Sequence, residues 1–176
     1  MFLIILRNKL RRPLPRKNYI KRENLFTVLD DVLDRKAVIL KGVAGSGKTT
    51  LITSYITERR KDDFLWLSLD KQLNDLVTLW TYLLHGLSDY IETEELIKSI
   101  NSSFTDSEVY SVLAHLIDLL DEKNDIFLVF DDFHVIDNEK LVDSLEFFIK
   151  NSADNLHFIM LTRDELPFYY SDMLVE

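Results

Sequence analysis

One stretch of eight residues restricts the possible folds of this chain more than any other feature. Gly42-Val-Ala-Gly-Ser-Gly-Lys-Thr49 fits the pattern G-x-x-x-x-G-K-S/T at every fixed position, one residue after the apolar run 37–40. The chain has 4 glycines, and three of them lie in this stretch. Glycines let the backbone N–H groups turn inward around an anion, and a helix that starts there adds its positive dipole end. The stretch therefore predicts a phosphate-binding loop between a strand and a helix.

Each polar side chain of such a loop has its own expected role. Lys48 can reach the β- and γ-phosphates of a nucleotide, the Thr49 hydroxyl can ligate Mg²⁺, and Thr50 is placed to meet the α-phosphate. The loop backbone that should surround the phosphates is formed by Gly42, Val43, Ala44, Gly45, Ser46 and Gly47. The alternative is a glycine-rich turn that only caps a helix. The flanking strand and helix patterns favour the phosphate-binding loop.

The rest of the chain alternates short apolar runs with segments of helical periodicity. This alternation predicts an α/β fold with a mainly parallel sheet of about five strands flanked by helices. The expected strands are 37–40, 64–67, 126–130 and 156–161, with 172–176 as a possible short fifth strand. The expected helices are 22–33, 49–60, 74–90, 106–120 with Asp106 as its N-cap, and 138–150, whereas 92–105 is less regular. Such sheets bind ligands at the carboxyl ends of their strands.

Polar residues follow two of these strands at that position. Asp131 and Asp132 come directly after the run 126–130, so we expect Asp131 to hold the metal through its water shell and Asp132 to orient the attacking water. The alternative is a pair of turn or helix-capping aspartates. Arg163 follows the run 156–161 and is expected beside the γ-phosphate, the alternative being a surface arginine in a turn.

Charge is distributed unevenly along the 176 residues, whose net charge is -9. Residues 1–22 carry eight Lys or Arg and no acid, a charge of +8, whereas 23–176 carry the other 13 basic and all 30 acidic residues, a charge of -17. So acidic a body disfavours binding to duplex DNA. The basic segment could touch nucleic acid, but a solvated leader is the better interpretation.

Composition excludes several other classes of protein. The chain has no cysteine, which excludes disulfide frameworks and zinc–thiolate sites. No apolar run reaches the roughly 18 residues of a membrane span, and the apolar start has neither a basic residue before it nor a signal-peptide cleavage pattern after it. We therefore expect a cytoplasmic protein without membrane contact.

Longer segments of the chain resemble the nucleotide-binding domain of STAND-class signal-transduction ATPases, and most of all the large LuxR-family transcriptional regulators of the MalT type. The resemblance covers residues 12–176. It is carried by Arg12-Pro13 with Tyr19-Ile-Lys-Arg-Glu23, by the phosphate-binding loop, by Trp66-Leu-Ser-Leu-Asp70 with Asn74-Asp75, by Phe127-Leu-Val-Phe-Asp-Asp-Phe-His134-Val-Ile-Asp137, and by Asn155-Leu-His-Phe-Ile-Met-Leu-Thr-Arg163.

This resemblance implies a P-loop NTPase fold of the ASCE type, in which the strand before Arg163 is inserted between the phosphate-loop strand and the Walker B strand. It implies ATP or ADP with Mg²⁺ as ligand, slow hydrolysis used as a switch, a resting ADP form and an ATP form that self-associates. Arg22 falls where the family places a Gly-Arg-Glu motif near the adenine, although Lys21 replaces the glycine.

The resemblance also implies a domain layout. Residues 1–18 form a basic leader and 19–176 a P-loop nucleotide-binding domain of the NB-ARC or AAA-like kind. The chain stops before the winged-helix, helical-repeat sensor and helix-turn-helix regions of full-length relatives. We therefore expect no direct DNA binding from this segment, and we expect partners among such regulatory domains.

Two other functions remain open from the sequence. One is an autonomous P-loop ATPase or phosphotransferase, and the other is an interaction module that nucleotide merely stabilises. A small-molecule kinase needs arginines in a lid that clamps the transferred phosphoryl group, and residues 64–162 contain none. The switch module is therefore the favoured hypothesis.

Overall fold

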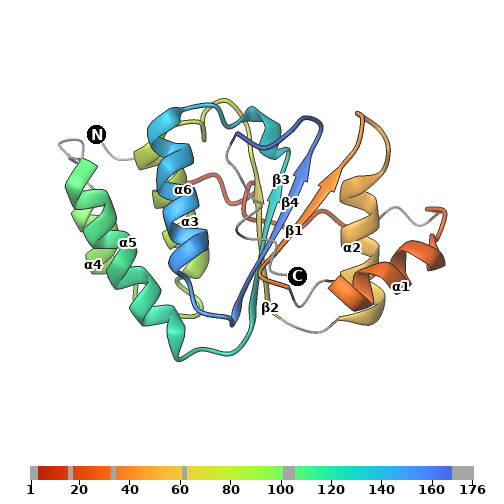
Figure 1. Cartoon of the computed structure of the whole chain (residues 1–176), viewed down its shortest axis with the longest axis horizontal. Helices are drawn as coiled ribbons and strands as arrows, with labels where there is room; N and C mark the ends of the chain where they lie inside the picture. Colours follow the sequence, from red (N-terminus) through yellow and green to blue (C-terminus); the bar gives the residue numbers. More distant parts are fainter. Residues whose placement is uncertain (1–3, 16–17, 33–34, 61–62, 101–105, 168–176) are drawn as a thin grey trace.

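A computed structural model describes residues 4–15, 18–32, 35–60, 63–100 and 106–167. Its sheet has four parallel strands in the order β1-β4-β3-β2 (Figure 1). The strands are β1 (Ala37–Lys41), β2 (Asp63–Ser68), β3 (Ile126–Asp131) and β4 (Leu156–Thr162). Because β4 lies between β1 and β3, the sheet has the strand insertion that the family resemblance implied. The fold is that of an α/β P-loop NTPase.

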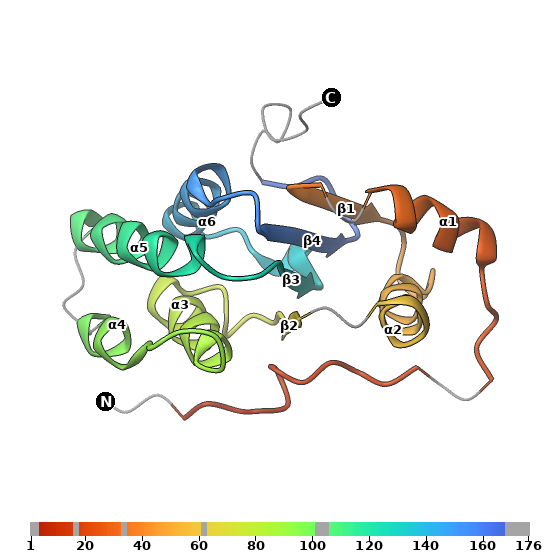
Figure 2. The ribbon, with the colours of Figure 1, turned by 90° about the horizontal axis from the view of Figure 1, so that it is seen from below.

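Helices cover both faces of this sheet. α1 (Glu23–Val32) and α2 (Lys48–Arg59) lie on one face, and α3 (Leu76–Leu87) and α6 (Glu139–Asn151) lie on the other (Figures 1 and 2). α4 (Glu94–Ser99) and α5 (Asp106–Asp121) form a further layer outside α3 and α6, and the short 3₁₀ helix η1 (Phe133–Val135) follows β3.

The strands separate the core into two hydrophobic clusters. Successive side chains of a strand point to opposite faces. In β2, Leu65 and Leu67 accordingly belong to the cluster under α3–α6, whereas Trp66 belongs to the cluster under α1 and α2. Every residue of β3 and β4 is buried. Burial on both faces is typical of the central strands of a parallel sheet and explains why their sequences are continuous apolar runs.

The helix and strand predictions hold with a few differences. α3 begins at Leu76 and not at residue 74, because the Asp75 side chain accepts a hydrogen bond from the Thr78 N–H and caps the helix. The irregular segment contains the six-residue helix α4, and α5 begins at Asp106 itself. The possible fifth strand at 172–176 lies outside the described residues. Among the described helices, none is long and apolar enough to cross a bilayer.

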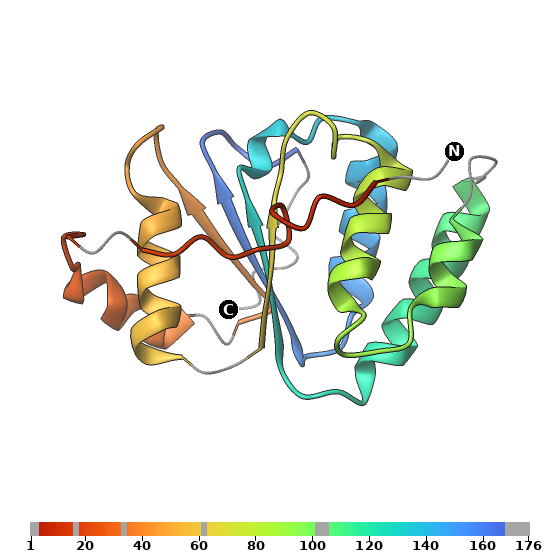
Figure 3. The ribbon, with the colours of Figure 1, turned by 180° about the vertical axis from the view of Figure 1, so that it is seen from behind.

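The basic N-terminal segment is not simply solvated. Its described part, residues 4–15, is here called the N-terminal strap. The strap runs along α3, past the open edge of β2 and on toward α2 (Figures 2 and 3). Lys9 is buried, and Leu10 packs against the core cluster under α3. The solvated-leader interpretation is therefore wrong at these two residues, although Arg7 and Arg11 are exposed.

Candidate functional site

The phosphate-binding loop joins β1 to α2 at the carboxyl edge of the sheet. Gly45 and Gly47 have φ angles of 76° and 88°, in the left-handed region that glycine adopts without strain. No side chain caps α2 at Gly47, so the first N–H groups of the helix remain as donors toward the loop. The Lys48 ammonium donates to the Gly42 carbonyl oxygen at 2.6 Å and so lies over the loop. The loop therefore has the backbone conformation expected of a phosphate-binding loop.

A second contact joins this loop to the end of β3. The Thr49 hydroxyl donates to the Asp131 carboxylate, with its oxygen 3.0 and 3.1 Å from the two carboxylate oxygens. These residues are 82 positions apart in the sequence. The structure therefore brings together the two side chains that the sequence nominated for the metal.

Asp131 is a buried acid in an unusual environment. Burial, the largest cause, raises its pKa, and the neighbouring Asp132 charge raises it further, although the hydrogen bond from Thr49 lowers it. A raised carboxylate pKa means that the fold disfavours the ionised form. A cation bound beside Asp131 would reverse that penalty.

Asp132 and Arg163 contact each other. The Arg163 guanidinium donates to an Asp132 carboxylate oxygen at 3.3 Å, and both side chains are nearly half exposed. Asp132 is the only non-glycine residue with a positive φ among the described residues, at 60°, a conformation that costs a non-glycine residue energy. His134, which is not among the predicted site residues, has its Nδ1 atom 3.8 Å from the same Asp132 oxygen. Its position two residues after Asp132 in the sequence could have indicated this closeness.

A cavity of about 510 Å³ opens beside the loop. Arg22 lines it and donates to the Ser46 carbonyl oxygen at 3.0 Å, so this arginine lies against the phosphate-binding loop. Lys21, which replaces the glycine of the family motif, forms ion pairs with Glu23 and Glu58. Sequence reasoning missed several other residues that line the cavity, namely Asn18, Tyr19, Ile20, Phe26, Leu51 and Ser54.

These residues fit a nucleotide with a divalent cation. The Ser46 hydroxyl is buried in the loop with no hydrogen-bond partner among the described residues. A Cβ atom at Gly42 would lie 2.9 Å from it, so a larger residue at position 42 would require the Ser46 side chain to move. The cavity volume lies within the range of about 300–1,000 Å³ that small-molecule sites occupy. Together with the Lys48 cation and the paired Thr49 and Asp131, the site has donors for phosphate and oxygen ligands for Mg²⁺.

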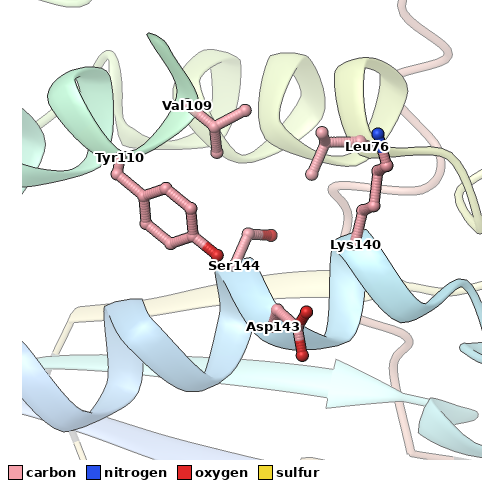
Figure 4. Close-up of a pocket in the computed structure, with 6 residues that line it drawn as sticks. All are labelled: Leu76, Val109, Tyr110, Lys140, Asp143 and Ser144. Carbon is pink, nitrogen blue, oxygen red and sulfur yellow. The ribbon is translucent and has the colours of Figure 1, made fainter. Parts of the chain in front are cut away.

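A second cavity does not fit such a ligand. It has a volume of about 80 Å³ and lies between α3, α5 and α6 (Figure 4). Its lining residues are Leu76, Val109, Tyr110, Lys140, Asp143 and Ser144. None of them belongs to the predicted site, and the volume is well below that of typical ligand pockets.

Comparison with known proteins gives a consistent result. Residues 19–166 match the NB-ARC domain. The chain is similar to the HTH-type transcriptional regulator MalT of Yersinia enterocolitica, with 28% identity over 176 residues, or 98% of this chain. It is also similar to MalT of Vibrio parahaemolyticus, with 29% identity over 91% of this chain, and to MalT of Klebsiella pneumoniae, with 27% identity over 92%. These matches cover only 18–19% of the relatives' length, so the chain spans about a fifth of the curated relatives it matches.

Proposed function

Because the chain belongs to the NB-ARC domain family of P-loop NTPases, we propose that it is the ATP- and ADP-binding switch module of a LuxR-type transcriptional regulator. The observation that supports the proposal is the contact between Thr49 and Asp131, which joins the start of α2 in the phosphate-binding loop to the end of β3. Burying a carboxylate is costly unless its charge is compensated, so the burial of Asp131 supports a metal-binding role.

The roles of the site residues follow from their positions. The loop backbone and Lys48 bind the phosphates, while the cavity beside Arg22 receives the base and ribose. Thr49 and Asp131 would hold Mg²⁺, which neutralises charge on the β- and γ-phosphates when bound. Asp132 orients the attacking water. Arg163, which pairs with Asp132 in this structure, would exchange that partner for the γ-phosphate.

At the level of the whole protein, the proposal includes slow hydrolysis that resets the switch. The ADP form is the resting state, and the ATP form self-associates or signals to regulatory domains. The similarity to MalT regulators supports this place in a longer protein. The proposed location is the cytoplasm. DNA would be bound by another domain.

Calorimetric titration with Mg-ATP and Mg-ADP tests the proposal, with Lys48→Ala as the control variant. We expect both nucleotides to bind the wild-type chain, and Lys48→Ala to abolish binding. A phosphate-release assay on the same samples should give turnover far below the 1–100 s⁻¹ typical of kinases. Rapid turnover would instead support an autonomous ATPase. Failure of both nucleotides to bind would contradict the proposal.

A further inference from the structure

Lys9 of the N-terminal strap is buried, although it lies in a basic segment of the sequence. It is the only buried lysine or arginine among the described side chains, at 8% exposure. Its ammonium lies 2.5 Å from an Asp70 carboxylate oxygen, donates to the Gln72 side chain at 3.2 Å and sits 5.7 Å from the centre of the Tyr82 ring. Burying an ammonium is costly unless it is paired, so these partners fix its position.

The backbone of the strap makes further contacts at the same place. The Ser68 N–H donates to the Lys9 carbonyl oxygen at 2.8 Å, and the Leu6 N–H donates to the Tyr82 hydroxyl at 3.0 Å. Ser68 is the last residue of β2, an edge strand of the sheet. The strap therefore satisfies an edge N–H group that would otherwise be open.

These contacts lead directly to the metal-binding acid. Ser68 is the register partner of Asp131 across β2 and β3, and the N–H of the next residue, Leu69, donates to the Asp131 carbonyl oxygen at 2.9 Å. Lys9 thus contacts the residues on either side of Leu69. Its backbone carbonyl accepts from Ser68, and its side chain pairs with Asp70. The matched family segment begins at residue 19, so the strap lies outside it.

We propose that Lys9 is a positioning residue for the metal-binding acid. The ion pair with Asp70 and the bond to Ser68 hold the end of β2, and the end of β2 holds the backbone of Asp131. The inference rests on the proposed nucleotide-binding function. Groups that orient a metal ligand typically affect metal affinity by about 10–100-fold when they are changed.

The test is a Mg²⁺ titration at saturating ATP. In Lys9→Met the methionine fills the same volume without the charge, and we expect the Mg²⁺ concentration for half-maximal binding to rise about tenfold. Nucleotide affinity without Mg²⁺ should not change, because the phosphate-binding loop is untouched. Lys9→Arg, which keeps the charge, should restore most of the wild-type response.

Lys36→Met is the matched control. Lys36 is a half-buried lysine just before β1, at the opposite edge of the sheet, where its ammonium donates to the Ala153 carbonyl oxygen at 2.6 Å. Its loss should lower stability without changing the Mg²⁺ response. If Lys9→Met does not fold, Asp70→Asn provides a milder test, because it keeps an oxygen acceptor for Lys9 while removing the charge, and it should shift the Mg²⁺ response in the same direction.

Amide hydrogen exchange without nucleotide gives a second measurement. Lys9→Met should speed exchange at Ser68 and Leu69, and Lys36→Met should not. An unchanged Mg²⁺ response in Lys9→Met and Asp70→Asn, or an equal shift in Lys36→Met, would overturn the inference while leaving the proposed function intact. Failure of the wild-type chain to bind nucleotide would overturn both.

Discussion

The contact between Thr49 and Asp131 joins the two halves of the candidate site through one hydroxyl group. Thr49→Val removes this hydroxyl while keeping the shape of the side chain. The variant should lose a metal ligand, and the pKa of Asp131 should rise further because the hydrogen bond that lowers it is gone. We expect the Mg²⁺ requirement for ATP binding to rise by at least about tenfold. Mg²⁺ titration of ATP binding by calorimetry measures the change.

Thr49→Ser serves as the control for this substitution because it keeps the hydroxyl. Asp131→Asn should give a similar loss, and the double variant should lose little more, since both changes remove the same metal site. Fully additive effects in the double variant would mean that Thr49 and Asp131 act separately.

The environment of Tyr55 predicts how the stability of the fold depends on pH. Its hydroxyl donates to an Asp30 carboxylate oxygen at 2.8 Å, and burial, followed by this hydrogen bond, raises the pKa of Tyr55 to about 12. An unfolded tyrosine ionises near pH 10. The stabilisation is therefore fully present below about pH 10, and it is lost as the pH rises toward 12 because only the unfolded state releases the proton.

Urea denaturation between pH 8 and pH 12 checks this expectation. The free energy of unfolding should fall less steeply above pH 10 in Tyr55→Phe than in the wild-type chain. Lysines and the other tyrosines titrate in both proteins, so the difference between the two curves isolates Tyr55. Parallel curves would show that Tyr55 keeps an ordinary pKa in the folded state.

Sequence reasoning predicted some residues of the site and missed others for a physical reason. The phosphate-loop motif fixes the sequence positions of Lys48 and Thr49, and Asp131 follows an apolar run directly. Local sequence spacing was therefore enough to predict all three. Lys9 stands in a basic run without apolar periodicity, and its burial depends on Asp70, which is 61 positions away. Long-range pairing of this kind leaves no local pattern.

At the scale of the elements, α3 approaches β2 closely at Gly86. A Cβ atom there would clash with the Leu65 side chain and lie 3.1 Å from Leu10 of the strap. Gly86→Ala should therefore destabilise the chain by about 1–3 kcal/mol through overpacking. Alanine favours a helix by up to about 1 kcal/mol over glycine, so the net loss of stability is up to about 2 kcal/mol.

Equilibrium urea denaturation measures the effect of Gly86→Ala. The exposed neighbour His85 provides the control, because His85→Ala changes helix propensity without entering the interface. If Gly86→Ala is more stable than the wild-type chain, the Leu65 and Leu10 side chains can move aside at little cost, and the overpacking prediction is wrong.

The elements also differ in how well the sequence predicted them. The strands β3 and β4 are continuous apolar runs because both of their faces are buried, so their positions were clear. α4 has only six residues, too few to display a helical period, and the sequence left it within an irregular segment. The start of α3 depended on which of two adjacent polar residues caps the helix.

At the scale of the whole molecule, the order of the strands in the sheet determines which residues meet at the candidate site. Periodicity predicts parallel strands but does not determine their order, and the expected insertion of β4 came from the family resemblance alone. With the order β1-β4-β3-β2, the ends of β1, β4 and β3 lie side by side. Lys48, Arg163 and Asp131 can then act on one ligand although 115 positions separate the first two.

Binding at this shared edge should stabilise the whole fold, because an unfolded chain has no such site. A ligand at 100 times its dissociation constant adds about 2.7 kcal/mol to the free energy of unfolding. For a domain of this size that corresponds to a rise in Tm of about 5–11 °C. We expect Mg-ADP to produce this rise in the wild-type chain and no rise in Lys48→Ala, as measured by scanning calorimetry. An equal rise in both proteins would place the bound nucleotide outside the phosphate-binding loop.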